Sequence, residues 1–380
     1  MDLAEARVKI DEIDKQLVDL FCRRMTVSRD VAAWKKEKGL PLTDPERERK
    51  KLVAVTQQAG EEFRGYTAAL YSQLFDLSKA YQAQLNRDKA PLCTMIEEAI
   101  AKTPEVFPEF APVACQGVEG AYSQEACERL FSVPNILFFK NFEGVFTAIE
   151  QGMCQYGVLP IENSTAGSVN AVYDLMMRHR FYIVRSVRLK VDHCLLAPAG
   201  TELKDLREVV SHEQALNQCA SFLKSLGDVK LTTFENTAAA AKYVAQSGRK
   251  DVAALSSRHC AALYGLNCLR ESVQDQGGNF TRFICIAREP EIYPGADKTS
   301  IMAVTPHKPG SLYKLLSRFF SLGINLTKLE SRPLPEREFE FMFYFDMEKP
   351  VRAPQMISLL GDLEGLCERF EYLGSYSEIV

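Results

Sequence analysis

A stretch of 36 residues without proline or glycine, from Leu3 to Lys38, constrains the fold of this sequence more than any other feature. Apolar residues recur along it at spacings of three and four, which is typical of an α-helix with one apolar stripe. At about 1.5 Å per residue such a helix would be about 50 Å long, which is longer than a small domain is wide. We therefore expect the stripe to need a second copy of the chain, in a homodimer or a higher homo-oligomer. The stripe consists of Leu3, Ala6, Ile10, Ile13, Leu17, Leu20, Arg24, Val27, Val31 and Trp34.

Two more helices are predicted in the N-terminal segment, residues 1–88. Gly39 and Pro41 end the first helix, and Asp44-Pro45 starts a second one with an acidic N-cap and a proline at the first helical position. Spacings of four and three then predict a third helix. Its apolar stripe contains Leu70, Leu74, Leu77 and Tyr81, and continues to Gln84.

Three polar residues lie on these apolar stripes: Arg24, Glu48 and Gln84. A buried guanidinium without an anion is strongly unfavourable, so Arg24 should meet a carboxylate of the protein or of a ligand. Lys35 lies three helical turns after Arg24, on nearly the same face. Two cations facing one pocket suit a dianionic ligand; the alternative is a structural ion pair between Arg24 and Glu48.

The segment resembles the all-helical chorismate mutase domain. The resemblance rests on Arg7-Val-Lys-Ile-Asp11, Arg23-Arg24, Lys35, Asp44-Pro-Glu-Arg47-Glu48 and Gln84. It implies that chorismate rearranges to prephenate here, a pericyclic reaction that needs a compact substrate conformer and donors aimed at the oxygen that gains negative charge.

The same resemblance implies a role for each of these polar residues. Arg7 of a second subunit, Arg24 and Arg47 would hold the two carboxylates of the substrate. Lys35 and Gln84 would donate to its ether oxygen. The ring hydroxyl would be held by Asp44 and Glu48.

Prolines mark residues 89–111 as a linker, and an α/β domain is predicted at 112–288. Short apolar runs at 113–115, 136–139 and 156–161 alternate with helical stretches, which indicates a parallel α/β arrangement.

Polar residues follow two of the apolar runs in this domain. Glu162-Asn163-Ser164-Thr165 comes after the run at 156–161, and Ser211-His212-Glu213-Gln214 comes after Val209-Val210. Ligands bind beyond the carboxyl ends of strands in such sheets. The alternative is that these residues only cap helices.

Five motifs in order make this domain similar to prephenate dehydratase. They are Gly117-Val-Glu-Gly120-Ala-Tyr122-Ser123, Pro160-Ile-Glu162-Asn163-Ser164, Ser211-His-Glu-Gln-Ala-Leu-Asn-Gln218-Cys219, Asn236-Thr237-Ala238 and Asn279-Phe-Thr281-Arg282-Phe283. The resemblance implies two α/β lobes like those of a periplasmic binding protein, with the site in the cleft between them. It makes Thr281 the catalytic hydroxyl. The substrate-binding positions that it implies are Glu162, Asn163, Ser164, Ser211, His212, Gln218 and Arg282.

The implied reaction removes the carboxylate and the ring hydroxyl of prephenate and gives phenylpyruvate. The departing hydroxide needs a proton donor. His212 is an alternative to Thr281, because a histidine titrates near neutral pH; the resemblance favours Thr281. Arogenate, which would give phenylalanine directly, is the alternative substrate.

Residues 297–376 are predicted to form a small α+β domain with βαββαβ order. A strand at 299–305 and a helix at 311–322 are followed by a strand in which Phe339, Phe341, Phe343 and Phe345 alternate with other residues, which predicts one buried aromatic face. A final helix is expected near 356–370.

This segment resembles an ACT regulatory domain. The resemblance rests on Gly310-Ser-Leu-Tyr313 and Glu330-Ser331-Arg332-Pro333. It implies feedback inhibition by phenylalanine, bound between paired domains. The implied binding residues are Gly310, Ser311, Leu312, Glu330, Ser331 and Arg332.

Composition excludes several other classes of protein. The net charge of -4 leaves no basic surface for nucleic acid, and no apolar run approaches the roughly 18 residues of a membrane span. No metal-ligand spacing and no glycine-rich dinucleotide loop occurs, so neither a metal nor a cofactor is expected. The 11 cysteines contain no C-x-x-C pair and the N-terminus lacks a signal peptide, which predicts a cytoplasmic protein. A ligand-binding regulator without turnover is the alternative from another class.

Overall fold

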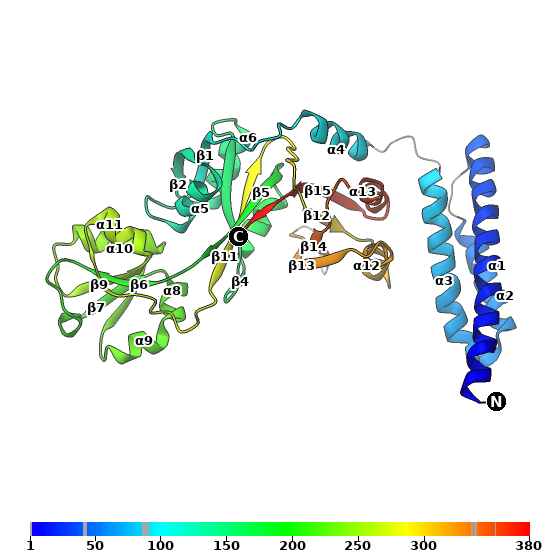
Figure 1. Ribbon diagram of the computed structural model, residues 1–380, viewed down its shortest axis with the longest axis horizontal. Helices are drawn as coiled ribbons and strands as arrows, with labels where there is room; N and C mark the ends of the chain where they lie inside the picture. The colour runs from blue at the N-terminus through cyan, green and yellow to red at the C-terminus, as the bar shows by residue number, and fades with distance from the viewer. Residues whose placement is uncertain (1, 41–43, 86–90, 336, 338–339, 354) are drawn as a thin grey trace. The chain divides into compact units, whose positions relative to one another are not determined.

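The computed structural model describes residues 2–40, 44–85, 91–335, 337, 340–353 and 355–380 (Figure 1). The chain divides into two compact units. One contains residues 1–94 with 358–365, and the other contains 95–357 with 366–380. No helix in the described part of the chain is long and apolar enough to cross a membrane.

The first unit contains α1 (Leu3–Glu37), α2 (Pro45–Gln58) and α3 (Gly60–Leu85), as the sequence predicts. Asp2 and Glu5 form a capping box at the start of α1. Asp44 caps α2 by accepting a hydrogen bond from the backbone N–H of Arg47 at 3.0 Å, with Pro45 at the first helical position. Helix α3 packs against both α1 and α2.

The apolar stripe of α1 lies largely in solvent. Ile13 and Leu17 are each 54% exposed and Val27 is 61% exposed, while Ala32 is the one buried residue among the described residues of α1. A stripe of this size left open by the chain's own helices is typical of a surface that another chain covers.

Helix α4 (Pro91–Lys102) lies inside the segment that the sequence marks as a linker. The first residues of that linker, 89 and 90, lie outside the described residues.

A seven-stranded sheet forms the first lobe of the second unit, in the order β16-β5-β11-β3-β1-β2, with β4 paired to β3. Strands β2, β1 and β3 are parallel, but β11 runs antiparallel to both β3 and β5. Its strands are β1 (Phe110–Gln116), β2 (Val133–Phe139), β3 (Tyr156–Asn163), β4 (Gly167–Ser168), β5 (Tyr182–Lys190), β11 (Phe280–Ala287) and β16 (Glu378–Ile379). The helices α5 (Tyr122–Leu130), α6 (Phe142–Glu150) and α7 (Asn170–Met176) accompany it.

A five-stranded sheet forms the second lobe, in the order β10-β6-β9-β7-β8. The chain enters this lobe after β5 and returns through β11, so two crossings join the lobes (Figure 1). The strands are β6 (Cys194–Ala197), β7 (Glu208–Ser211), β8 (Lys230–Thr233), β9 (Val252–Ser256) and β10 (Asn267–Arg270). The helices are η1 (Leu203–Asp205), α8 (Glu213–Gln218), α9 (Ala220–Ser225), α10 (Thr237–Gln246) and α11 (Arg258–Tyr264).

The two-lobed α/β architecture agrees with the sequence prediction, but a purely parallel arrangement is wrong. Strand β11 returns from the second lobe and enters the first sheet between β3 and β5, which reverses its direction. In the second sheet, β6 is antiparallel to both β9 and β10.

The C-terminal segment has the predicted βαββαβ order, and its antiparallel sheet runs β13-β14-β12-β15. The elements are β12 (Lys298–Val304), α12 (Ser311–Ser321), β13 (Asn325–Pro333), β14 (Phe341–Glu348), α13 (Met356–Glu364) and β15 (Arg369–Tyr376). The final helix is shorter than predicted, because β15 starts at Arg369.

The prediction of one buried phenylalanine face on β14 needs correction. Phe341 is 43% exposed, whereas Met342, Tyr344 and Asp346 on the opposite face are almost fully buried. Phe345 is buried as well and its ring lies 5.5 Å from that of Phe319 on α12. Strand β14 is therefore covered on both faces; Phe339 lies outside the described residues.

The first lobe covers the second face of β14. The ring of Tyr344 packs edge-on against the ring of Tyr173 of α7, with 5.1 Å between the ring centroids. Both residues belong to one core cluster with Ile284 of β11. Strand β15 approaches β5 so closely that a Cβ on Gly374 would lie 2.2 Å from the carbonyl oxygen of Ile183, which only glycine permits. The first lobe and the C-terminal sheet thus share one hydrophobic core.

Candidate active sites

In the helical unit, Arg24 is bound by neutral groups of α3. Its guanidinium donates to the carbonyl oxygen of Leu74 at 3.2 Å and to the hydroxyl of Ser78, and lies 5.9 Å from the ring of Phe75. Among the described residues no carboxylate lies within ion-pair distance of Arg24. Glu48 pairs with Lys79 instead, at 3.1 Å. The alternative of an Arg24–Glu48 ion pair is therefore not observed.

Among the other predicted mutase residues, Arg7 lies too far from Arg24 to join it within a single chain. Arg7 is exposed and lies on the same helix seventeen residues earlier, about 25 Å away along the axis. Asp44 and Arg47 are exposed at the start of α2, and Lys35 is half-buried. Gln84 belongs to α3, but its side chain lies outside the described residues.

In the second unit, the pairing of β3 with β11 sorts four of the predicted residues into two pairs. Thr281 lies opposite Asn163, and Arg282 lies opposite Glu162. Successive side chains of a strand point to opposite faces, so the pair Asn163–Thr281 and the pair Glu162–Arg282 lie on different sides of the sheet.

Hydrogen bonds fix the pair Asn163–Thr281 at the end of the two strands. The side-chain NH₂ of Asn163 donates to the hydroxyl oxygen of Thr281 at 2.9 Å and to Oδ1 of Asn279 at 2.7 Å. Oδ1 of Asn163 accepts from the hydroxyl and the backbone N–H of Thr165 at 2.7 and 3.0 Å. Since both ends of the amide have partners, the donor that Asn163 aims at Thr281 is held in place. Ser164 joins the strand ends by donating to the carbonyl oxygen of Gly278 at 2.8 Å.

Gln218 connects this cluster to the second lobe. From the end of α8, its side-chain NH₂ donates to the hydroxyl of Thr165 at 2.8 Å, and its Oε1 accepts from Asn279 at 2.9 Å. Nε2 of His193 lies 3.0 Å from the same oxygen. Since Oε1 can only accept, Nε2 of His193 carries the hydrogen.

Sequence reasoning assigned no role to three members of this cluster: Thr165, His193 and Asn279. Thr165 and Asn279 stood inside quoted motifs. His193 is 2% exposed, and burial lowers its pKa although Gln218 and Asp192 act in the opposite direction. Its position at the entry to an apolar run, Cys194–Ala197, was the available signal.

Ser211 and His212 are not brought into this cluster by any described contact. Ser211 is buried at the end of β7 and donates to the carbonyl oxygen of Leu255 at 2.6 Å. His212 caps α8, where its Nδ1 accepts from the backbone N–H of Gln214 at 3.3 Å.

Glu162 and Arg282 form ion pairs on the other side of the sheet. Glu162 lies 2.9 Å from Arg282 and 3.0 Å from Lys328 of β13. Burial raises the pKa of Glu162, but the two cations outweigh it and hold this pKa below its usual value.

The residues predicted to bind phenylalanine lie in two places. Gly310, Ser311 and Leu312 line a surface pocket of about 640 Å³ between β12 and α12. Glu330 accepts from the hydroxyl of Ser168 at 2.5 Å, and Arg332 makes two hydrogen bonds to Asp174, both 2.9 Å. Ser331, between them, is exposed.

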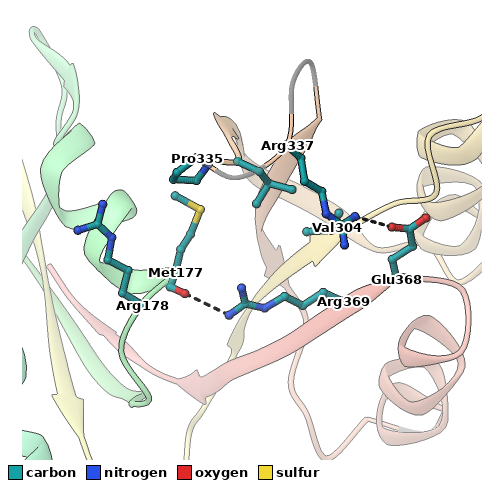
Figure 2. A pocket seen from close by; sticks show the side chains of 8 residues that line it. Met177, Arg178, Val304, Pro335, Arg337, Glu368 and Arg369 are labelled. Carbon is teal, nitrogen blue, oxygen red and sulfur yellow. Dashed lines mark hydrogen bonds and ion pairs between the residues drawn. The ribbon is translucent and has the colours of Figure 1, made fainter.

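A pocket of about 460 Å³ lies where α7 of the first lobe approaches the C-terminal sheet (Figure 2). Arg369 crosses its floor and donates to the carbonyl oxygen of Met177 at 3.1 Å, and Arg337 pairs with Glu368 at 2.8 Å. None of the residues predicted for substrate or effector lines it.

Comparison with known families matches both units. The family model for chorismate mutase type II matches residues 6–83, and the model for prephenate dehydratase matches residues 113–291.

Curated relatives agree with the second match. Arogenate dehydratase 2 of Petunia hybrida is 41% identical over 281 residues, covering 70% of this chain and 71% of its own. Arogenate dehydratase/prephenate dehydratase 2, chloroplastic, of Arabidopsis thaliana is 42% identical over 276 residues, covering 70% of this chain and 72% of its own.

Solved structures resemble the same part of the chain. Prephenate dehydratase from Arthrobacter aurescens in complex with L-Phe has 26% identity and a TM-score of 0.65, covering 70% of this chain and 90% of its own. GqqA, described as a novel type of quorum quenching acylase, has 33% identity and a TM-score of 0.63, covering 70% of this chain and 97% of its own.

The chain belongs to the prephenate dehydratase family and carries a chorismate mutase type II domain ahead of the dehydratase domain. It is thus an enzyme with an isomerase domain and a carbon–oxygen lyase domain, and these domains belong to aromatic amino acid biosynthesis.

Proposed function

We propose that the helical unit converts chorismate to prephenate and that the two-lobed domain converts prephenate to phenylpyruvate under feedback inhibition by phenylalanine. The observation that carries the dehydratase proposal is the cluster around Thr281, which both lobes build from Asn163, Asn279 and Gln218. A site between two lobes is the usual place for a small-molecule ligand.

The hydrogen bonds of Thr281 give it a role in the dehydration. Its oxygen accepts from Asn163, so its own O–H remains to donate to the departing hydroxyl of the substrate. When the carbon–carboxylate bond breaks, its electron pair forms the new ring double bond, carbon dioxide leaves, and the hydroxide takes a proton to become water. The Asn163 donor supports the threonine oxygen while it passes that proton on.

The mutase reaction requires no proton transfer, so positioned cations and donors are sufficient. Arg24 is held by the carbonyl oxygen of Leu74 and the hydroxyl of Ser78, and it has no carboxylate partner among the described residues. A carboxylate of chorismate is the anion we propose for it. Because Arg7 is about 25 Å away on the same helix, the Arg7 that completes this site is proposed to come from a second copy of the chain.

Prephenate is proposed as the substrate of the dehydratase domain because the mutase domain of the same chain produces it. Arogenate is the second candidate, since the curated relatives are named arogenate dehydratases. The two substrates differ by an amino group in place of a carbonyl.

The C-terminal segment is proposed to be an ACT domain that binds phenylalanine. Its βαββαβ order and the pocket beside Gly310, Ser311 and Leu312 support this proposal. Glu330 and Arg332 hold Ser168 and Asp174 of the first lobe, so a ligand that binds them can act on the dehydratase domain by favouring a state without these bonds.

A coupled assay tests the proposal. Purified protein receives chorismate, and chorismate, prephenate and phenylpyruvate are followed together with and without phenylalanine; a parallel sample receives arogenate. Formation of phenylpyruvate that phenylalanine suppresses is the expected result. Accumulation of prephenate together with turnover of arogenate would reject prephenate as the second substrate. Unchanged rates with millimolar phenylalanine would reject the regulatory role.

A further inference from the structure

Arg282 is a buried cation near the dehydratase site that faces three carboxylates. Its side chain is 8% exposed and lies 2.9 Å from Glu162, 2.6 Å from Asp346 and 3.4 Å from Glu378. It also donates to the hydroxyl oxygen of Tyr376 at 3.0 Å. A buried charge is strongly unfavourable without an opposite charge nearby, so these carboxylates compensate the buried guanidinium.

Two of these carboxylates come from outside the dehydratase domain. Asp346 belongs to β14 of the C-terminal sheet, is fully buried, and accepts from the hydroxyl of Ser300 at 2.5 Å. Glu378 belongs to β16, the last strand of the chain, and also pairs with Arg188 of β5 at 2.7 Å. Strands β14 and β16, both C-terminal to the dehydratase domain in sequence, therefore supply two of the three carboxylates around Arg282.

The geometry of β11 connects this group to the catalytic side. Arg282 follows Thr281 directly, and their side chains lie on opposite faces of the strand. The ion pairs of Arg282 therefore hold the strand at the residue next to Thr281. The register of β11 against β3 also changes at this point, between Arg282 and Phe283, where the ladder alone holds the strand less firmly.

We propose that Arg282, Asp346 and Glu378 form a buried ionic clamp through which the C-terminal segment positions Thr281 opposite Asn163. In this view Arg282 is a positioning residue and does not bind substrate, and the dehydratase site is complete only when β14 and β16 are in place. The proposal rests on the dehydratase function proposed above and extends it to residues of the C-terminal segment.

The test uses the full chain with the double substitution Arg282→Gln and Asp346→Asn. Removing Arg282 alone would leave the Asp346 carboxylate buried without an opposite charge, and the variant could then fail to fold. In the double variant the remaining charges keep partners, because Glu162 retains Lys328 and Glu378 retains Arg188 and Lys298. Calorimetry then identifies temperatures at which this variant is fully folded, and kcat and KM for prephenate are measured there.

The expected result separates positioning from stability. In the folded double variant, kcat should fall by roughly tenfold or more with KM within about twofold, because misplacement of a reacting group reduces the rate and leaves substrate binding intact. The mutase rate of the same sample measures the amount of chain. Arg282→Lys should recover part of kcat, since it retains the charge but cannot face three carboxylates with three separate nitrogens.

Glu371→Gln is the matched control, because it removes an exposed carboxylate from the same C-terminal sheet, where it pairs with Arg369 at 3.3 Å. Its kcat should equal that of the unaltered protein. A folded double variant with kcat within twofold of the unaltered protein, or an equal loss in Glu371→Gln, would overturn the clamp. If the unaltered protein converts neither prephenate nor arogenate, the dehydratase function itself is refuted, which is a different result.

Discussion

The two catalytic regions of this chain differ in how much of a site one copy can assemble. In the helical unit, Arg7 and Arg24 lie about 25 Å apart on one helix whose apolar stripe is exposed. In the second unit, Asn163, Thr281, Asn279 and Gln218 are already bonded to one another across two lobes.

The difference follows from the kind of structure that carries each region. The apolar stripe of α1 is left exposed by α2 and α3, whereas Gln218 of the second lobe is bonded to the strand ends of the first lobe within one chain. The mutase activity should therefore depend on association of chains, while the cluster around Thr281 should be assembled in each copy.

The largest effect is expected for Thr281→Ala. Removal of the hydroxyl that Asn163 supports should lower the dehydratase kcat by about 100-fold or more, and the mutase rate should not change. Steady-state assays of both activities on one preparation check this. His212→Asn is the matched substitution, because the contact described for the His212 side chain is the cap of α8, and it should keep kcat within about threefold. The opposite ranking would make His212 the proton donor.

A charge on the exposed stripe of α1 should separate the two activities. Leu17→Asp places a carboxylate where we expect apolar contact with a second chain, so mutase activity should fall by roughly tenfold or more while prephenate turnover persists. Sedimentation alongside both assays measures this. Lys15→Asp introduces the same side chain on exposed α1 and serves as the control. Full mutase activity in Leu17→Asp would show that one chain suffices.

A smaller loss of dehydratase activity is expected when the side chain of Gln218, which connects the two lobes, is removed. Gln218→Ala removes the donor to Thr165 and the acceptor for Asn279 and His193. The dehydratase kcat should fall by about tenfold, because the lobes then hold the cluster less firmly. Gln214→Ala, on the same helix but exposed, is the control. An unchanged kcat would mean that the hydrogen bonds of Gln218 do not contribute to turnover.

The smallest effect concerns pH and stability. Burial lowers the pKa of His193, so between that value and the ordinary value near 6.5 the unfolded chain binds a proton that the folded chain does not. Stability of the second unit should therefore fall as pH decreases below 6.5, by at most about 1.4 kcal/mol per pH unit from this group.

His193→Gln should reduce that slope, and calorimetric unfolding of both proteins between pH 5.5 and 7.5 tests it. At pH 7.5, where the histidine is neutral in both states, the variant is expected to be no more stable than the unaltered protein. If the free energy of unfolding depended on pH equally in the two proteins, His193 would not be buried in its neutral form.

The sequence alone predicted the three helices of the N-terminal unit and the βαββαβ order of the C-terminal segment. Helix periodicity and capping by Asp2 and Asp44 are local, so they can be read from neighbouring residues. The resemblance assigned Thr281 to catalysis and Arg282 to substrate binding, and only the register of β11 against β3 placed their side chains on opposite faces of the sheet.

Only the tertiary structure decided which groups meet across long separations. His193 reaches Gln218 through the fold of the second lobe, and Asp346 reaches Arg282 because β14 packs its second face on the first lobe. The pattern on β14 predicted the phenylalanines inside, yet Met342, Tyr344 and Asp346 are the more deeply buried row. The periodicity of a sequence shows that two faces of a strand or helix differ in polarity. Which face is buried, and which segment covers it, depends on contacts between distant parts of the chain, and a local pattern does not contain this information.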